Sequence, residues 1–469
     1  MSRLLVIGTG PLLEEGVTFF SGQCLRTWHL TQPLIGAGHE IHLVTLPIDD
    51  RDHHEGQPVF TDATHEGFAH RRGHTNRLDL LMPLLSEIVS EVQPDAIIGI
   101  NPWPSSVVCR LGTDLPLWAD MNGYAPAEGQ TRGRVHDDDV ALAHFWEMEW
   151  RVVRRADRIS TVTRRQADAT LGELAMAGRL NRHTFNHPFV HFIPNAAAEH
   201  FRNLERPEPH MRGKKIPATE FIILWSGGFN TWTDVDLLHE ALERLLSQCP
   251  DVHFVATGGA IAGHDERTFE RFRRLSANSP SGARRHLLGW VPSQVVDSLF
   301  FEADLGINID SPNWETHFGA RNRLISMMAC GLPVLTTRGT EISEDLAEAD
   351  AAMLVPMRDP AALTDALMRL HEDPELLRRL AERGREVVRS RYSPEATTKA
   401  LCAWAVNPET APDQGRRGDN PVDQRIRQIE PERLASLLRD ERDLAQIRSR
   451  WYWRLAKRLK SLIRRESSA

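Results

Sequence analysis

A pair of glycines, Gly227 and Gly228, follows the apolar run 221–225 and precedes a predicted helix. Glycine has no Cβ, so backbone amides at such a turn can approach a ligand closely, and the N-terminus of the next helix adds partial positive charge. Asn230 and Thr231 supply uncharged polar groups to the same turn. The arrangement favours a diphosphate-binding turn, although a glycine pair also follows the strand in many ordinary αβ connections.

The first half of the chain offers further candidates where predicted elements begin or end. Ser21 and Gly22 begin an amphipathic helix whose N-terminal amides could face a ligand, or Ser21 could be an ordinary helix cap. Asp120 follows the apolar run 117–119 and precedes Asn122. A carboxylate there could orient or deprotonate a substrate hydroxyl, with Asn122 on the same side of the site, or it could simply form the turn.

Short apolar runs alternate with longer amphipathic runs, which is typical of parallel strands covered by helices. The predicted fold class is α/β, with two doubly wound, Rossmann-like parallel-sheet domains and a C-terminal helical tail. We place the first domain at residues 1–195, a connector at 196–219, the second domain at 220–395, and a linker with the tail at 396–469. Such sheets bind ligands at the carboxyl ends of their strands, so we expect a cleft between the domains.

Composition narrows the functional class. Hydrophobic residues make up 41% and charged residues 26% of the chain, as in ordinary globular proteins. The net charge of -8 argues against nucleic acid as a partner. Five scattered cysteines, an N-terminus unlike a signal peptide and no run long enough to span a membrane predict a cytoplasmic protein. No group of side chains has credible metal-ligand spacing, so we expect no metal and no other cofactor.

The segment that starts at Glu315 carries the most specific pattern. Glu315 is followed by Phe318 and Gly319, and then by Met-Ala-Cys-Gly-Leu-Pro-Val at 328–334. This segment resembles the donor-binding segment of the retaining, glycogen-synthase-like glycosyltransferases called group 1 or family 4, and the likeness extends over roughly residues 1–395. The resemblance implies the GT-B arrangement of two domains. It also implies transfer of a sugar from a nucleotide-sugar to a hydroxyl, with retention of configuration and no obligatory metal.

The resemblance implies roles for single residues as well. Glu315 matches the Glu that holds hydroxyls of the donor sugar, and the alternative is a plain surface carboxylate. Glu341 matches a loop beside the donor, and it could equally be an acidic residue in the first turn of a helix, where the helix dipole favours it. Ser326, however, stands where those enzymes have a second Glu that contacts the ribose, and no basic residue follows the glycine turn. We infer that Arg321 and Arg323 supply the missing charge, because the guanidinium fork can hold two phosphate oxygens. Both arginines could instead be solvated residues at a helix start.

Two other functions fit the same pattern: a nucleotide-sugar epimerase of this architecture, and a catalytically silent GT-B scaffold. For a transferase, the expected partners are a nucleotide-sugar donor and a hydroxyl acceptor, which is lipid-linked if the enzyme makes surface polysaccharide or glycolipid. Residues 448–465 hold eight basic residues and no acidic one, and Trp451, Leu455, Leu459 and Leu462 share one helical stripe. We expect this tail either to bind the anionic inner face of a membrane or to pack on protein.

Overall fold

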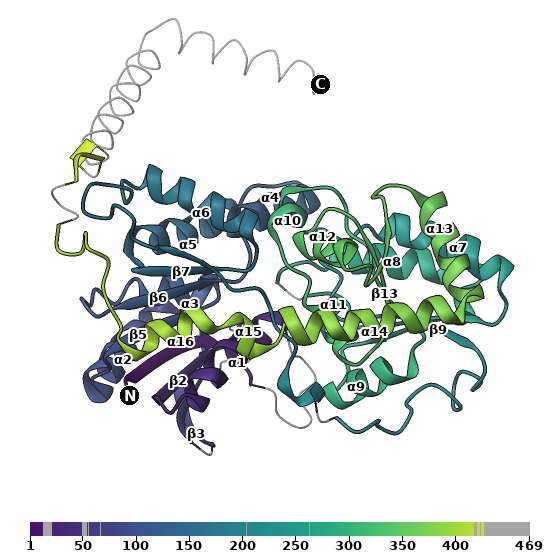
Figure 1. The fold of residues 1–469 in the computed structure, drawn as a ribbon, viewed down its shortest axis with the longest axis horizontal. Coiled ribbons are helices and arrows are strands. Elements are labelled where there is room, and N and C mark those ends of the chain that lie inside the picture. The colour runs from purple at the N-terminus through teal and green to yellow at the C-terminus, as the bar shows by residue number, and fades with distance from the viewer. Residues whose placement is uncertain are drawn as a thin grey trace, which may run out of the picture. The chain divides into compact units, whose positions relative to one another are not determined.

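The structure is a computed structural model that describes residues 1–12, 21–48, 54, 56–65, 67–202, 204–261, 263–416, 420–422 and 424–425. Contacts divide the chain into two units, residues 1–173 with 186–411 and residues 174–185 with 412–469. The first unit holds two α/β sheets, so the predicted pair of parallel-sheet domains is confirmed (Figure 1). The predicted basic tail at 448–465 lies outside the described residues.

The first sheet has eight strands in the order β3-β4-β2-β1-β5-β6-β7-β8. Its strands are β1 Arg3–Thr9, β2 Glu40–Leu46, β3 Phe60–His65, β4 Phe68–Gly73, β5 Ala96–Ile100, β6 Leu117–Met121, β7 Arg158–Thr161 and β8 Val190–Phe192. All neighbours pair in parallel except β3 and β4, which form an antiparallel pair at the edge. We predicted no strand between residues 47 and 77, because that stretch is polar, as an edge hairpin can be.

The second sheet has six parallel strands in the order β11-β10-β9-β12-β13-β14. They are β9 Phe221–Trp225, β10 Val252–Thr257, β11 Arg285–Gly289, β12 Leu305–Asn308, β13 Val334–Thr337 and β14 Met353–Val355. Two separate groups of buried apolar side chains pack around this sheet. Helices therefore cover both of its faces, which is why its strands are near-continuous apolar runs.

The helices follow the predicted alternation. Those of the first half are α1 Gly22–Gly36, α2 Leu78–Val92, α3 Pro102–Val108, α4 Ala125–His136, α5 Leu142–Arg155 and α6 Arg164–Met176. Those of the second half are α7 Val235–Gln248, α8 Arg267–Ala277, α9 Ser293–Glu302, α10 Trp314–Phe318, α11 Asn322–Ala329, α12 Glu341–Glu348, α13 Pro360–Glu372 and α14 Pro374–Arg391. Among the described residues, no helix is both long and apolar enough to cross a membrane.

The chain returns to the first sheet after α14. The short helices α15 Pro394–Thr397 and α16 Lys399–Val406 follow α14 directly, and α16 runs along the first domain (Figure 1). Leu401 and Trp404 of α16 lie in the same apolar cluster as Trp118 of β6. Part of the segment that we assigned to the linker thus contributes to the core of the first domain.

The order of the strands in each sheet shows where a crevice for a ligand can form. In the second sheet β9 lies between β10 and β12, and in the first sheet β1 lies between β2 and β5. At such points consecutive connections leave toward opposite sides of the sheet, so the loops at the carboxyl ends diverge and leave a crevice. The turn with Gly227 and Gly228 directly follows β9.

Candidate active site

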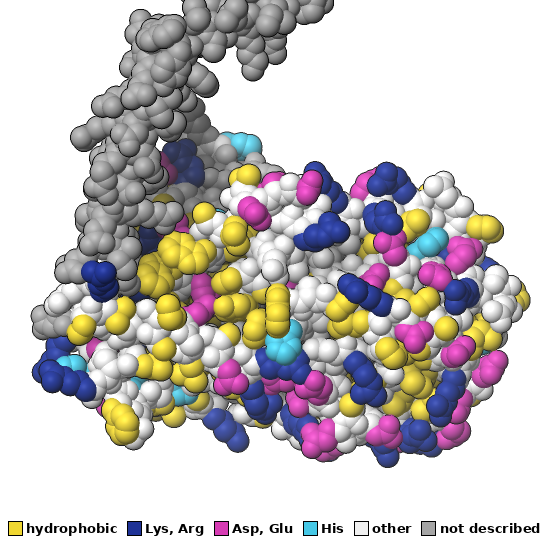
Figure 2. Space-filling view, turned by 90° about the horizontal axis from the view of Figure 1, so that it is seen from above, with side chains coloured by type: hydrophobic (Ala, Val, Ile, Leu, Met, Phe, Trp, Pro, Cys, Tyr) yellow, Lys and Arg dark blue, Asp and Glu magenta, His cyan; other side chains and the backbone are white. Residues whose placement is uncertain are grey.

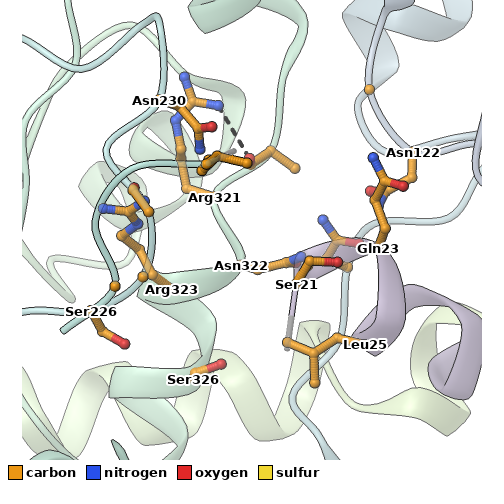
Figure 3. A pocket seen from close by; sticks show the side chains of 18 of the residues that line it. Ser21, Gln23, Leu25, Asn122, Ser226, Asn230, Arg321, Asn322, Arg323 and Ser326 are labelled. Carbon is orange, nitrogen blue, oxygen red and sulfur yellow. Dashed lines mark hydrogen bonds between the residues drawn. The ribbon is translucent and has the colours of Figure 1, made fainter. Parts of the chain in front are cut away.

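A cavity of about 390 Å³ is lined by residues from both sheet domains (Figure 3). The first domain contributes Ser21, Gly22, Gln23, Leu25, Asn122, Tyr124 and Glu128, among others. The second contributes Ser226, Gly227, Gly228, Asn230, Glu315, Arg321, Asn322, Arg323 and Ser326, among others. The cavity therefore brings together most of the sequence-predicted site residues, from positions far apart in the chain.

The glycine turn after β9 is packed tightly against the turn after β10. Gly227 has a φ of 91°, and Gly258 has a φ of 75°. A Cβ on Gly258 would lie 2.3 Å from the carbonyl carbon of Gly227, and a Cβ on Gly228 would lie 2.7 Å from Cδ1 of Ile261. Side chains are excluded at these positions, so backbone forms this wall of the cavity.

Arg323 lies beside the glycine turn. Its guanidinium is 4.2 Å from the centroid of the Trp225 ring, and Nη2 donates a hydrogen bond of 2.7 Å to the carbonyl oxygen of Gly228. Nη1 is buried and has no hydrogen-bond partner within the described residues. Burial lowers the pKa of Arg323 to about 10, so the side chain stays charged at neutral pH. A half-buried cation with a free donor beside a backbone turn is suited to an anion such as a diphosphate.

Arg321 lies only two residues away in a different environment. Its Nε donates to Oδ2 of Asp310 at 3.0 Å, and its Nη2 donates to Oε2 of Glu315 at 2.9 Å. Only 3% of the arginine is exposed. The guanidinium of Arg321 thus donates hydrogen bonds to two carboxylates, and its charge holds Glu315 at the cavity wall.

Glu315 lies on α10, which Asn313 caps by accepting a hydrogen bond of 2.8 Å from the amide of Thr316. Burial raises the pKa of Glu315 to about 7, and the charge of Arg321 opposes that rise. Both carboxyl oxygens are oriented by the arginine, because Nη1 also donates to Oε1 at 3.1 Å. The geometry is that of a fixed acceptor for hydroxyl groups.

The first domain faces Glu315 with a second carboxyl group, Glu128 of α4. Its carboxyl oxygen lies 3.5 Å from Nε2 of His264. Burial raises the pKa of Glu128 to about 7, and the charge of Glu128 contributes to the raised pKa of Glu315. The same wall carries Tyr124, whose hydroxyl donates to Oε1 of Glu173 at 2.7 Å.

The remaining acceptor-side candidates also line the cavity. A Cβ on Gly22 would lie 2.7 Å from Nδ2 of Asn322, so glycine allows the start of α1 to approach α11 of the other domain. Asn122 is oriented by a hydrogen bond of 3.0 Å from its Nδ2 to Oδ1 of Asn101.

Three predicted site residues do not line the cavity. Asp120 is fully buried, where its carboxylate accepts hydrogen bonds of 2.6 Å from Nη2 of Arg26 and 2.6 Å from the Ser160 hydroxyl. Thr231 lies 2.9 Å from the hydroxyl of Thr131 across the two domains.

Glu341 is the third of these residues. It stands at the start of α12 and accepts hydrogen bonds of 2.8 Å from the amide and 2.8 Å from Nη1 of Arg164. Its carboxylate therefore joins the two domains. The carboxylates of Asp120 and Glu341 thus accept hydrogen bonds from residues that are distant in the chain, and the sequence did not reveal these partners.

Several cavity residues escaped the sequence reasoning. Glu128 sits in a helix of mixed polar residues with no motif around it, and Tyr124 follows Asn122 and Gly123 without any sign of its direction. Asp297 and His200 also line the cavity, from α9 and from the connector. Of these residues, only Tyr124 could have been found from the sequence, since it lies two residues after Asn122, which was already a candidate. Among the described residues, no group of three or more His, Cys, Asp or Glu side chains is arranged to hold a metal ion.

Basic and acidic side chains are interspersed over the described face in Figure 2. This surface gives no preference for a large polyanion, since such a partner requires a concentration of positive charge. The expected exclusion of nucleic acid remains a prediction.

Two families match this chain. Residues 220–373 match "Glycosyl transferases group 1", and residues 21–182 match "Glycosyl transferase 4-like domain". A curated 2-deoxystreptamine N-acetyl-D-glucosaminyltransferase of Streptomyces fradiae is 25% identical over 53% of this chain and 55% of its own length. A D-inositol 3-phosphate glycosyltransferase of Corynebacterium urealyticum is 28% identical over 45% of this chain and 49% of its own length. The chain thus spans about half the length of the curated relatives it matches.

Solved structures share the fold at low identity. Sucrose-phosphate synthase from Thermosynechococcus elongatus is 18% identical with a TM-score of 0.62, over 86% of this chain and 97% of that one. The α,α-trehalose-phosphate synthase (UDP-forming) of Burkholderia xenovorans is 12% identical with a TM-score of 0.63, over 86% and 100%. Anabaena HepE in complex with UDP-glucose is 14% identical with a TM-score of 0.57, over 87% and 99%. Residues 220–373 of this chain thus form a group 1 glycosyltransferase domain and residues 21–182 a glycosyltransferase 4-like domain, and together they share the GT-B fold of these solved structures.

Proposed function

We propose that the protein is a glycosyltransferase that moves a sugar from a nucleoside diphosphate sugar to a hydroxyl acceptor. The observation that carries the proposal is Arg323, a half-buried cation whose buried Nη1 has no hydrogen-bond partner within the described residues, beside the backbone turn of Gly227 and Gly228. Both named relatives are transferases, which favours transfer over epimerisation.

In this proposal the donor lies along the second domain. Its diphosphate contacts the glycine turn, Asn230 and Arg323, and its sugar reaches Glu315, which accepts hydrogen bonds from the hydroxyls. The chemical contribution of Arg323 is to stabilise the charge that develops on the leaving diphosphate. The acceptor enters from the first domain, where Asn122 and Glu128 lie, and the enzyme holds its hydroxyl near the anomeric carbon.

We propose retention of configuration, on the resemblance to the retaining enzymes of this type. Glu315 is held at both carboxyl oxygens by Arg321, so it is suited to bind hydroxyls rather than to attack carbon. The NMR signal of the anomeric proton in the product tests this stereochemistry. An inverted anomeric centre would refute it.

The test of the activity is a screen of common nucleotide-sugars for donor hydrolysis and transfer, with calorimetry of the matching nucleoside diphosphate. The expected result is release of one nucleoside diphosphate and binding of the same compound. A sugar isomer formed without acceptor would instead identify an epimerase. Absence of binding to every donor would identify a silent scaffold.

We also propose that the reaction needs no metal and no other cofactor, because Arg323 and backbone amides supply the positive charge that the diphosphate requires. Addition of EDTA is expected to leave the rate unchanged. Restoration of a lost rate by Mg²⁺ or Mn²⁺ would refute this part of the proposal.

The acceptor in this proposal is lipid-linked, in the synthesis of surface polysaccharide or glycolipid at the cytoplasmic face of a membrane. Support comes from the sequence of residues 448–465, which lie outside the described residues and hold eight basic and no acidic residues. Each Lys or Arg near an anionic surface contributes about 1 kcal/mol. The full chain is expected to sediment with anionic liposomes at low salt, and a chain that ends at Ile447 is not. Equal sedimentation of both would remove the tail from membrane binding.

A further inference from the structure

Within the described part of the first domain, Glu128 of α4 is the only acidic residue that lines the cavity. Its side chain is 26% exposed, and one carboxyl oxygen lies 3.5 Å from Nε2 of His264 in the second domain. Burial lowers the pKa of His264 to about 4, so the imidazole is neutral at neutral pH. The histidine therefore brings no positive charge to the carboxylate.

Within the described residues, no Lys or Arg forms an ion pair with Glu128. Arg132 lies one turn further along α4, and its Nη1 donates a hydrogen bond of 2.9 Å to the carbonyl oxygen of Gly263 instead. The charge of Arg132 opposes the effect of burial without cancelling it, since the pKa of Glu128 stays raised to about 7. The ionised carboxylate is unfavourable here unless a ligand brings positive charge to it.

The charged groups around Glu128 make this end of the cavity negative. Across the cavity, the cation Arg321 lies between two carboxylates, those of Asp310 and Glu315. Together with Glu128, three carboxylates and one guanidinium meet here when all four groups are ionised. Among the described lining residues the other arginine is Arg323, which lies at the glycine turn where the proposed diphosphate binds. A net negative field favours a cation over an anion at the Glu128 end.

The described part of the first domain contributes no Lys or Arg to the cavity wall. Its other polar side chains there are uncharged, among them Ser21, Gln23 and Asn122 (Figure 3). A phosphorylated acceptor that enters from this side would thus meet no opposite charge and would lose hydration without compensation. A cationic acceptor would meet Glu128.

We propose that Glu128 selects an acceptor that carries an ammonium group, as an amino sugar does, and that its carboxylate pairs with this group. The inference rests on the proposed function, because it names the acceptor class of the same cavity. An ionised carboxylate only accepts hydrogen bonds, and an ammonium group only donates them, so each satisfies the other. The ammonium group positions the acceptor, and a separate hydroxyl receives the sugar. The condition applies equally to a free amino sugar and to one carried on a lipid.

The experiment measures sugar affinities by calorimetry at neutral pH, on the full chain saturated with its preferred nucleoside diphosphate. The probes are glucose, its 2-, 3-, 4- and 6-amino-deoxy forms, and glucose 6-phosphate. The wild-type protein is expected to bind at least one amino sugar about 10-fold or more tightly than glucose, because the ammonium group gains charge-assisted hydrogen bonds. It is expected to bind glucose 6-phosphate more weakly than glucose.

Variants assign the preference to one side chain. Glu128→Gln keeps the size of the side chain and removes its charge, so the ratio of amino-sugar to glucose affinity is expected to fall toward one. A purely structural role would weaken both sugars alike and leave this ratio unchanged. Glu87→Gln, at an exposed position on α2 of the same domain, is the matched control and is expected to keep the wild-type ratio. If Glu128→Gln does not fold, Glu128→Asp carries the test, because moving the carboxylate by one methylene must lower the ratio.

The outcomes separate the two proposals. If the wild-type protein binds no nucleoside diphosphate, the proposed function fails, and this inference fails with it. If it binds one but prefers no amino sugar to glucose, or prefers glucose 6-phosphate, only the acceptor class fails. A preference that Glu128→Gln, or Glu128→Asp where it carries the test, retains in full would place the cation elsewhere and overturn the role of Glu128.

Discussion

The two arginines at the start of α11, Arg321 and Arg323, lie in two different regions of the same cavity wall. Arg321 faces β12 and α10, where Asp310 and Glu315 neutralise it, whereas Arg323 faces the turn after β9, where it meets an indole ring and a carbonyl oxygen. Both residues are arginines, and only one residue separates them in the chain. The comparison teaches that the surrounding charges decide which arginine is fully paired within the protein and which one keeps a free donor at the cavity.

The largest expected effect is on the Arg321 side. Arg321→Ala leaves two buried carboxylates without their cation, so we expect the free energy of unfolding to fall by about 3–5 kcal/mol. Urea denaturation measures it. Arg271→Ala is the matched control, because Arg271 pairs with Asp236 at the surface and its loss is expected to cost about 1 kcal/mol or less. Similar losses in the two variants would show that the buried network is not stabilising.

The Arg323 side is expected to respond in binding rather than in stability. Arg323→Ala removes a charge-assisted donor from the diphosphate, so the affinity for the nucleoside diphosphate is expected to drop about 10- to 150-fold. Calorimetry with the same nucleoside diphosphate measures it. Arg323→Lys keeps the positive charge but lacks the planar guanidinium fork, so its affinity for the nucleoside diphosphate is expected to lie between those of wild type and Arg323→Ala. Unchanged affinity in folded Arg323→Ala would remove this arginine from the site.

Glu315 belongs to both regions, because it lines the cavity and is held by Arg321. In Glu315→Gln the side chain stays in place but becomes a weaker acceptor, so turnover is expected to fall about 10-fold or more. The affinity for the nucleoside diphosphate is expected to stay nearly constant, since the partners of Glu315 are sugar hydroxyls. Equal losses in nucleoside diphosphate affinity and in turnover would contradict this assignment.

The smallest expected effect concerns Glu128 and pH. Its pKa of about 7, raised from an ordinary 4.5, means that the folded protein favours the protonated form. The stability that this group contributes is therefore complete below about pH 4.5 and is lost as the pH rises through about 7. The full shift corresponds to about 3 kcal/mol. Because 26% of the side chain is exposed, we expect about 1–2 kcal/mol.

Urea denaturation of wild type and Glu128→Gln at pH 5 and pH 8 measures this effect. The variant is expected to lose less stability between the two values. Glu270→Gln is the control, because Glu270 is an exposed residue of α8. The same pH dependence in Glu128→Gln and wild type would place the titration elsewhere.

Local sequence determined the alternation of parallel strands and helices and the position of the glycine turn, but not the polar edge hairpin of β3 and β4. The runs around β9 and β12 are apolar throughout because both faces of a parallel sheet are covered, and this pattern can be read without the fold. The pair Gly227 and Gly228 was predicted from the sequence as a turn where backbone can approach a ligand, and the turn does follow β9. The close contact of this turn with Gly258 and Ile261 after β10 is a tertiary contact that the sequence did not reveal.

The directions of charged side chains were decided by the tertiary structure. Asp120 follows Trp118 by two residues on β6, so both point to the same face of the sheet, where Arg26 of α1 meets the carboxylate. Glu128 was overlooked because the carboxyl group that it faces, Glu315, comes from the other domain. A single sequence shows which residues can carry charge. It does not show which opposite charges lie within a few ångströms, since those partners are brought together only when distant segments pack.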